Sequence, residues 1–192
     1  MCIRDRDNIS YKFEPRQFYV IKGVSGSGKS TLVKVLVGIL QASKGKVIRN
    51  LSSEWNHKDL MYIPQNPPML NANIDKFISW PDEDHDEKSL DEAKQFACVD
   101  FDSNTGQSES SVNLVFSGGQ LQRLHLARLF YHKPKVVIMD ESTSAIDLEK
   151  EKTILGHLKE YAKKNCVIAV AHRTQFEGFA TKILTLKNGE VI

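Results

Sequence analysis

GVSGSGKST at residues 23–31 decides the fold predicted for this chain. Two glycines separated by four residues, then Lys and Ser, form the pattern of a loop that binds nucleoside triphosphates. The apolar run Phe18–Ile21 predicts a buried strand before the loop, and residues 32–37 predict a helix after it. The alternative is a Gly/Ser-rich turn before an ordinary helix. The order of strand, loop, Lys-Ser and helix favours phosphate binding.

The chemistry of the loop assigns a role to its side chains and its backbone. Glycines let successive N–H groups point inward, and the N-terminus of the following helix favours an anion. Lys29 can reach the β- and γ-phosphates, and the Ser30 hydroxyl can bind Mg²⁺. The residues expected to bind nucleotide here are Gly23, Ser25, Gly26, Ser27, Gly28, Lys29, Ser30 and Thr31.

Composition is that of an ordinary folded domain. The chain has 192 residues, of which 41% are hydrophobic and 26% charged, and its net charge of +2 does not argue for nucleic acid as a partner. Three scattered cysteines without a CxxC spacing favour a reducing cytosol and argue against disulfides or a zinc site. We see no signal peptide and no apolar run near the ~20 residues of a membrane helix. We therefore expect any membrane part on another chain or on a missing portion of this one.

The pattern along the chain predicts an α/β fold with an inserted helical segment. The β pattern fades at Gln65 and returns after Pro134, so residues 8–64 and 134–192 are expected to form the α/β core and residues 65–133 a helical subdomain. We expect Met1–Asp7 to be a non-native scar and residues 81–87 to be a solvated acidic loop. Besides the first strand and helix, which reaches about Leu40, the predicted strands are 9–13, 45–49, 60–63, 135–139, 166–171, 182–187 and 190–192, and the predicted helices are 74–80, 88–98, 119–131 and 148–164.

A second chemical motif ends the strand Val136–Met139. Asp140 and Glu141 follow this strand, and ligands of open α/β sheets bind at the carboxyl ends of strands. Asp140 would help to hold Mg²⁺ beside the phosphate loop, and Glu141 could act as general base on the attacking water. The alternative is a buried strand followed by a solvated acidic turn.

The third motif lies at the start of an amphipathic helix. Ser117, Gly118 and Gly119 form a second candidate anion site there. Helix capping alone would explain Ser and Gly at these positions. It does not explain why Gln120 and then Arg123 follow.

With these motifs, the chain resembles the nucleotide-binding domains of ATP-binding cassette (ABC) proteins from about Ile9 to Ile192. A lone Gln or His would be a weak signal, but here several motifs follow the order found in the family. They are Gly23–Thr31 (Walker A), Gln65 (Q-loop), Ser117-Gly118-Gly119-Gln120 (signature), Val136–Glu141 (Walker B), Ser144–Asp147 (D-loop) and His172 (switch histidine).

The resemblance implies a P-loop NTPase core with a mainly parallel sheet, a small antiparallel β part and the helical subdomain. It implies an ATPase that uses ATP and Mg²⁺, in which two domains close head-to-tail around two ATP molecules. The signature residues of one domain would then contact the γ-phosphate held by Lys29 of the other. His172 would hold that phosphate, Gln65 would sense Mg²⁺, and Asp147 would communicate across the interface.

Further details of the sequence resemble the exporter branch of the family. The segments around Gln65, Glu141–Asp147 and His172 are exporter-like, which implies a transmembrane partner domain and a place on the cytoplasmic face of a membrane. The family's adenine-stacking aromatic would lie before the start of this chain, so we expect an N-terminally truncated domain that binds ATP weakly. Tyr11 and Phe13 are expected to be core or sheet residues.

Other classes of protein are less well supported. A soluble ABC ATPase acting on nucleic acid or ribosomes would carry basic extensions or a second cassette, and no nucleic-acid partner is expected here. The signature stretch argues against a P-loop kinase, and a GTPase would need an Asn-Lys-x-Asp motif. Glu141 and His172 argue against a non-catalytic cassette.

Overall fold

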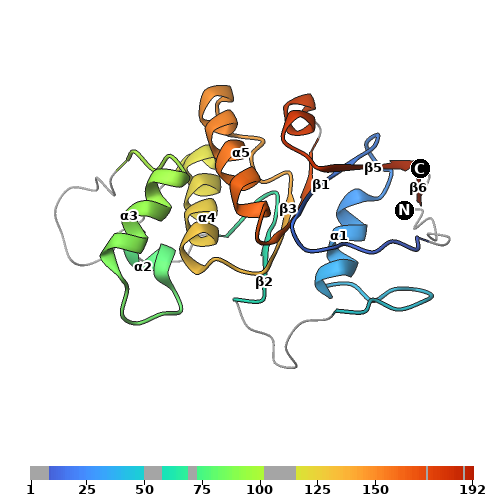
Figure 1. The fold of residues 1–192 in the computed structure, drawn as a ribbon, viewed down its shortest axis with the longest axis horizontal. Helices are drawn as coiled ribbons and strands as arrows, with labels where there is room; N and C mark the ends of the chain where they lie inside the picture. Colours follow the sequence, from blue (N-terminus) through green and yellow to red (C-terminus); the bar gives the residue numbers. More distant parts are fainter. Residues whose placement is uncertain (1–8, 50–57, 69–72, 102–115, 172, 188) are drawn as a thin grey trace. The chain divides into compact units, whose positions relative to one another are not determined.

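The computed structural model describes residues 9–49, 58–68, 73–101, 116–171, 173–187 and 189–192 (Figure 1). Its contacts divide the chain into two compact units. The first contains residues up to Tyr62, Pro134–Glu141 and Leu158–Ile192, and the second contains Ile63–Lys133 and Ser142–His157. Each unit is described by itself.

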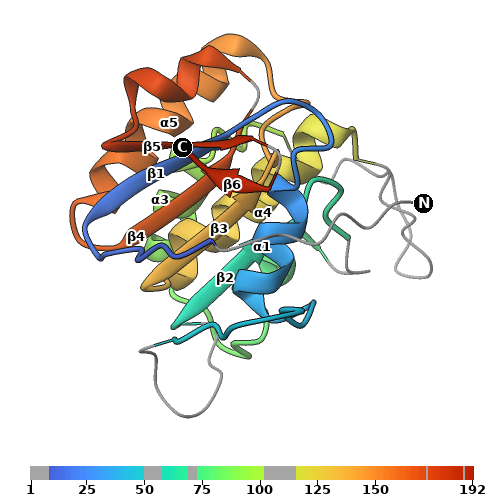
Figure 2. The ribbon, with the colours of Figure 1, turned by 90° about the vertical axis from the view of Figure 1, so that its right-hand side faces the viewer.

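A sheet forms the centre of the first unit, and its strand order is β2-β3-β4-β1-β5-β6 (Figure 2). Strand β1 pairs in parallel with β4 and β5, and β3 pairs in parallel with β4, while β6 runs antiparallel to β5. The mainly parallel α/β fold with a small antiparallel part is thus confirmed. The strands are β1 (Gln17–Lys22), β2 (Leu60–Ile63), β3 (Val136–Asp140), β4 (Cys166–Val170), β5 (Lys182–Lys187) and β6 (Glu190–Val191).

Both faces of this sheet are buried, as in other parallel sheets. Tyr19 and Ile21 share one face with Leu32 and Val33 of helix α1 (Lys29–Val37) in a single hydrophobic cluster. On the opposite face, the ring of Phe18 meets Phe176 edge-on in the 3₁₀ helix η1 (Thr174–Gly178). The apolar run in β1 therefore has a partner on each side.

Helix α1 ends three residues before the predicted end near Leu40. It ends at Val37, because Gly38 adopts a left-handed backbone (φ 84°) and its N–H donates to the carbonyls of Lys34 and Val35. The side chain of Arg49 donates to the carbonyl oxygens of Leu36 and Val35 at 2.9 and 3.2 Å. A cation at this end complements the helix dipole.

Two predicted strands do not form in the described residues. Residues 9–13 are not in a strand; instead the rings of Tyr11 and Phe13 pack edge-on around Tyr19. Phe13 packs against the core as expected, whereas Tyr11 is 39% exposed, and neither residue lies in the sheet. Residues 45–49 are also not in a strand. The side chain of Arg49 instead donates a hydrogen bond to the last turn of α1.

The second unit is built around helix α4 (Gly118–His132), which contacts both α2 (Ile74–Ser79) and α3 (Glu87–Phe96). Side chains are buried on most sides of α4, including the polar residues Gln122 and Arg123. The sequence predicted this helix as amphipathic, with Leu121 among its apolar positions, but Leu121 is only half-buried. A central helix has no fully solvated face, so polar residues are buried too.

Residues 142–157 join the second unit through contacts with α4 and the segment after α3. The ring of His157, in helix α5 (Leu148–Ala162), stacks on Phe96 with centroids 4.6 Å apart. Asp100 accepts from Arg123 at 2.6 Å and from Lys150 at 2.7 Å. These two cations lower the pKa of Asp100 to about 2.

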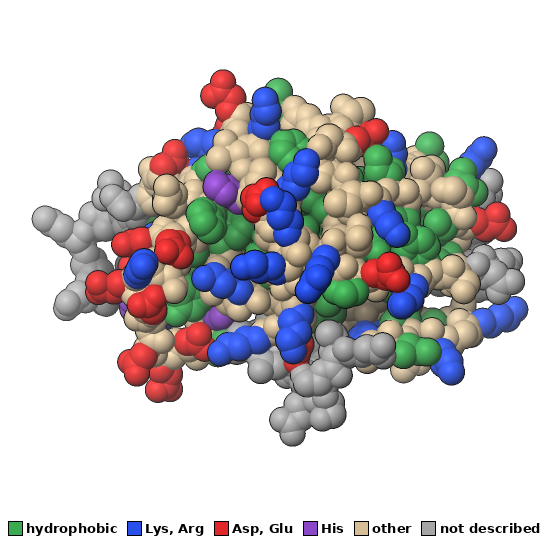
Figure 3. Space-filling view, viewed as in Figure 1, with side chains coloured by type: hydrophobic (Ala, Val, Ile, Leu, Met, Phe, Trp, Pro, Cys, Tyr) green, Lys and Arg blue, Asp and Glu red, His purple; other side chains and the backbone are tan. Residues whose placement is uncertain are grey.

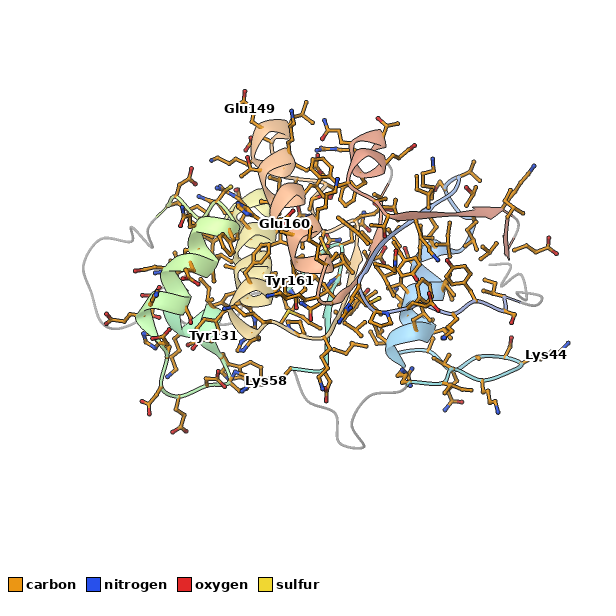
Figure 4. The ribbon with its side chains drawn as sticks, in the orientation of Figure 1. Lys44, Lys58, Tyr131, Glu149, Glu160 and Tyr161 are labelled. Atoms are coloured by element: carbon orange, nitrogen blue, oxygen red, sulfur yellow. The ribbon has the colours of Figure 1, made fainter. Side chains whose placement is uncertain are left out.

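The C-terminal end of α5, which carries Tyr161 (Figure 4), lies in the first unit. There the Tyr161 hydroxyl donates to the Pro134 carbonyl.

The predicted acidic loop is solvated. Glu83, Asp84, Asp86 and Glu87 are exposed, and acidic side chains gather beside α3 in Figure 3. Asp86 also accepts from Ser89 N–H at 2.9 Å and so caps α3. None of the helices in the described residues has the length and apolar composition needed to cross a bilayer. The prediction for Met1–Asp7 lies outside the described residues.

Candidate functional site

The loop between β1 and α1 turns sharply over the carboxyl end of the sheet. Gly26 has φ 76°, a left-handed value that disfavours other residues, and Ser27 N–H donates to Val24 O at 3.1 Å. A Cβ on Gly23 would lie 2.3 Å from the Leu186 carbonyl oxygen of β5. Close approach to β5 therefore requires glycine at the first position of the motif.

Lys29 folds back under this loop. Its Nζ donates to the carbonyl oxygens of Gly23 at 2.8 Å and Val24 at 3.1 Å, and only 5% of the residue is exposed. Both partners are neutral carbonyl oxygens, and within the described residues the ammonium has no carboxylate in hydrogen-bond contact. Ser27 Oγ is also buried in the loop and has no hydrogen-bond partner within the described residues. A buried cation and an unsatisfied hydroxyl side by side suit an anionic ligand.

The two expected Mg²⁺ ligands of this unit meet directly. Ser30 Oγ donates to Asp140 Oδ1 at 3.1 Å, although the residues are 110 positions apart. Burial raises the pKa of the Asp140 carboxyl, and the hydrogen bond from Ser30 opposes that shift. A desolvated carboxylate beside a hydroxyl is an oxygen-rich setting, which Mg²⁺ prefers.

Glu141 is held in an unusual backbone conformation. Its φ of 51° is left-handed, and its N–H donates to the Val170 carbonyl of β4 at 3.1 Å. Such values are costly for a residue with a side chain, and they concentrate at functional sites. The chain thus turns immediately after Asp140, where sequence analysis placed the general base.

The segment that carries the expected switch histidine starts beside the phosphate loop. His172 itself lies outside the described residues. The preceding residue, Ala171, donates its N–H to the Ile21 carbonyl of β1 at 3.4 Å. Five residues after His172, Glu177 accepts from Lys22 Nζ at 2.8 Å, and Lys22 directly precedes the loop. Both contacts tie the histidine segment to β1.

The signature residues begin helix α4. Ser117 Oγ accepts from Gln120 N–H at 3.2 Å, and the Gln120 side chain accepts from Ser117 N–H at 2.9 Å. This capping box uses both side chains and satisfies two of the donors that a helix start leaves open. Helix capping therefore accounts for the Gln120 side chain as well as for Ser117, which the sequence alone did not indicate. Gly118 and Gly119 follow at the first turn.

The D-loop lies against this turn of α4. A Cβ on Gly119 would lie 2.5 Å from the Ala145 carbonyl oxygen. Asp147 Oδ1 accepts from Lys150 N–H at 3.0 Å, so this expected interface residue caps the start of α5.

Gln122 is the residue of this site that sequence reasoning did not select. Its side chain contacts the backbone of Gln65 as well as Ser144 and Ala145. The one available signal was a polar residue on a face expected to be apolar.

The first unit gathers the residues of the Walker A and Walker B motifs, and the second gathers Gln65, the signature and Asp147.

Comparison of the chain with known proteins supports the family resemblance inferred from the motifs. The family profile described as "ABC transporter" matches residues 6–144. The chain belongs to the ABC transporter family. It is 32% identical over 197 residues to a putative export ATP-binding/permease protein of Rickettsia bellii, covering 96% of this chain and 34% of that protein. It is 30% identical over 199 residues to ABC transporter B family member 26, chloroplastic, of Arabidopsis thaliana, covering 96% and 28%.

The fold agrees with a solved structure from the same family. A bacterial Atm1-family ABC exporter with ATP bound superposes with a TM-score of 0.83 at 23% identity, covering 98% of this chain and 35% of that one. The chain is therefore an ABC ATPase domain homologous to exporters, and it spans about a third of the length of these proteins. The soluble alternative, acting on nucleic acid or ribosomes, is not favoured.

Proposed function

We propose that this ABC domain binds and hydrolyses ATP between two head-to-tail copies and so drives conformational change in a transmembrane transporter, an exporter. The observation that carries the proposal is the contact between Ser30 and Asp140, which joins the Walker A loop to the Walker B carboxylate. The buried Lys29 ammonium beside the unsatisfied Ser27 hydroxyl adds the positive, hydrogen-bonding environment that phosphate needs.

The residues of the site suit Mg²⁺ as well as ATP. Ser30 and Asp140 already share a hydrogen bond, and both offer the oxygen atoms that Mg²⁺ requires. Gln65 is proposed to supply a third oxygen. When bound, Mg²⁺ would neutralise charge on the β- and γ-phosphates.

Each remaining residue has a role that follows from its chemistry. Lys29 would bind the γ-phosphate through its ammonium, and the N–H groups of residues 25–31 would bind the other phosphates. The Glu141 carboxylate would orient the attacking water and accept its proton. His172 would hold the γ-phosphate.

A second copy would complete the site. Ser117, Gly118, Gly119 and Gln120 of that copy would donate to the γ-phosphate, while Asp147 would lie at the interface. The Ser117 hydroxyl accepts a capping hydrogen bond and still has its own proton to donate. Phosphate charge would then be neutralised only when both copies are present, so ATP would hold them together.

The remaining parts of the proposal concern partners and location. The Rickettsia bellii relative is named as an ATP-binding/permease protein, which supports a transmembrane partner domain and a place on the cytoplasmic face of a membrane. We further propose a single ABC domain with residues 8–64 and 134–192 as the α/β core. Residues 65–133 would be the helical subdomain that contacts the transmembrane partner.

The test compares ATP binding and turnover in Lys29→Ala with those in Lys44→Ala. Lys44 is exposed in the loop after α1 (Figure 4), so it controls for the loss of one positive charge. We expect Lys29→Ala to lower ATP affinity at least tenfold and to abolish phosphate release, because the buried ammonium has no substitute. Equal affinity in the two variants would contradict the proposed phosphate site.

A further inference from the structure

Gln122 is a buried polar residue to which none of the motifs assigns a role. It lies on α4, two residues after the signature, and only 3% of it is exposed. A buried amide is costly unless its donors and its acceptor are all used. Its contacts therefore indicate what holds it in place.

Three hydrogen bonds connect this side chain to two separate loops. Gln122 Oε1 accepts from the Ala145 N–H at 2.9 Å. Gln122 Nε2 donates to the Gln65 carbonyl oxygen at 3.3 Å and to Ser144 Oγ at 3.3 Å. The two loops are 57 and 22 residues away from Gln122 in the chain.

The orientation of the amide follows from its partners. The Ala145 N–H can only donate, so it must face the oxygen, and the Gln65 carbonyl can only accept, so it must face the nitrogen. No rotation of the amide can exchange these roles without losing both bonds. The amide oxygen thus bonds the D-loop at Ala145, while the amide nitrogen bonds the Gln65 carbonyl and the D-loop residue Ser144.

The D-loop end of this link is fixed to α4 by a second contact. Gly119 lies so close to Ala145 that an added Cβ would be 2.5 Å from its carbonyl oxygen. The first turn of α4 and residues 144–145 are therefore in close contact. Gln65 and Ser144 are both exposed, so the link runs from the buried side of α4 to two surface loops.

We propose that Gln122 is a positioning residue that couples the Q-loop to the D-loop within one ABC domain. This inference rests on the proposed function, in which Gln65 contributes to the Mg²⁺ site and Asp147 lies at the interface. A displacement of residues 144–145, as when a second copy docks, pulls on Ala145 N–H and is passed through the Gln122 amide to the Gln65 carbonyl. The position of Gln65 then depends on whether a second copy is docked.

Two substitutions separate the parts of this link. Gln122→Glu keeps an oxygen for Ala145 N–H but places a carboxylate without a proton against the Gln65 carbonyl. Gln122→Met removes all three hydrogen bonds at similar volume and without charge, so it serves if the buried carboxylate prevents folding. Gln95→Glu on α3 is the matched control, because Gln95 is exposed and belongs to no part of the site.

The experiment measures kcat, KM for ATP and ATP affinity for each variant. Coupling predicts a fall in kcat of at least tenfold in both Gln122 variants. ATP affinity should stay within about threefold, because the Walker A residues lie in the other unit. A merely structural role would lower the amount of folded protein without changing kcat per folded molecule. A kcat within twofold of the Gln95→Glu control would overturn the proposal.

Amide hydrogen exchange gives a readout independent of turnover. We expect Gln122→Met to speed exchange at residues 65–66 and 144–146 together, with no change in Gln95→Glu. Faster exchange at only one of the two loops would overturn the coupling. If the unchanged chain neither binds nor hydrolyses ATP, the proposed function fails, and exchange still decides whether the two loops are linked.

Discussion

At the scale of single residues, the signature depends on how closely α4 approaches the D-loop. Gly119→Ala would place a Cβ 2.5 Å from the Ala145 carbonyl oxygen, whereas Gly118→Ala would place one 3.5 Å from the Ala145 Cβ. We expect Gly119→Ala to lower the free energy of unfolding by about 1–3 kcal/mol, since backbone atoms must move. Gly118→Ala should be within about 0.5 kcal/mol of the unchanged chain or slightly more stable.

Urea unfolding of the two variants checks this prediction. The pair is matched, because both substitutions add one methyl group in the first turn of the same helix. If both variants have the same stability, the contact between Gly119 and Ala145 does not hold the D-loop against α4.

The sequence predicted the individual site residues better than it predicted their partners. A phosphate-loop motif fixes residue types at fixed spacing, so the place of Ser30 at the end of this loop could be anticipated. The carbonyl partners of Lys29 and the amide link of Gln122 could not, because tertiary packing decides them. The strained φ of 51° at Glu141 also leaves no trace in composition.

At the scale of elements, helix α5 contains one glycine that no contact requires. In the part of the chain that the structure describes, nothing lies within 4 Å of a Cβ built on Gly156. We expect Gly156→Ala to raise the free energy of unfolding by about 0.5–1 kcal/mol, because alanine loses less backbone entropy in a helix. Thermal unfolding should show a midpoint higher by about 1–4 °C. A lower midpoint would mean that an unseen contact needs the glycine.

Helix α4 contains a histidine that should make stability depend on pH. His125 Nε2 donates to the Pro68 carbonyl at 2.8 Å, and burial lowers the pKa of His125 to about 4 from 6.5. The nearby Arg128 acts in the same direction. Because the folded pKa is depressed, the unfolded chain binds the proton more readily, and stability falls as pH drops from about 6.5 towards 4.

Urea unfolding at pH 7 and pH 5 measures this effect. We expect the contribution of His125 to the loss between these two values to be about 2 kcal/mol at most. His125→Gln should remove that part, while His85→Gln, at an exposed position in the acidic loop, should leave it unchanged. An unchanged pH dependence in His125→Gln would contradict the neutral, buried histidine.

Elements with strong periodicity were predicted within a few residues, but two short strands were not. Alternation at residues 9–13 reflects aromatic packing on Tyr19. The predicted strand 45–49 was wrong, and Arg49 in this segment donates a hydrogen bond to the end of α1 instead. Short alternating segments do not reveal whether a neighbouring strand exists, so periodicity cannot separate these cases.

At the scale of the whole molecule, the motifs are divided between two compact units. The first holds the Walker A and Walker B residues, and the second holds Gln65, the signature and the D-loop. Residues 142–157 belong to the second unit through contacts such as that of Lys150 with Asp100, which no local pattern in the sequence could predict. The proposed function assigns residues of both units, and of a second copy, to ATP binding and hydrolysis.

Dimerisation that depends on ATP tests this central claim most directly. Glu141→Gln should slow hydrolysis while keeping nucleotide binding, and so trap the closed pair. Size-exclusion chromatography with light scattering should then show a dimer with ATP and a monomer without it. Ser117→Arg added to Glu141→Gln should abolish the dimer, because a bulky cation replaces the hydroxyl that is proposed to donate to the γ-phosphate. A monomer at every ATP concentration, or a dimer that persists with Ser117→Arg, would contradict the account.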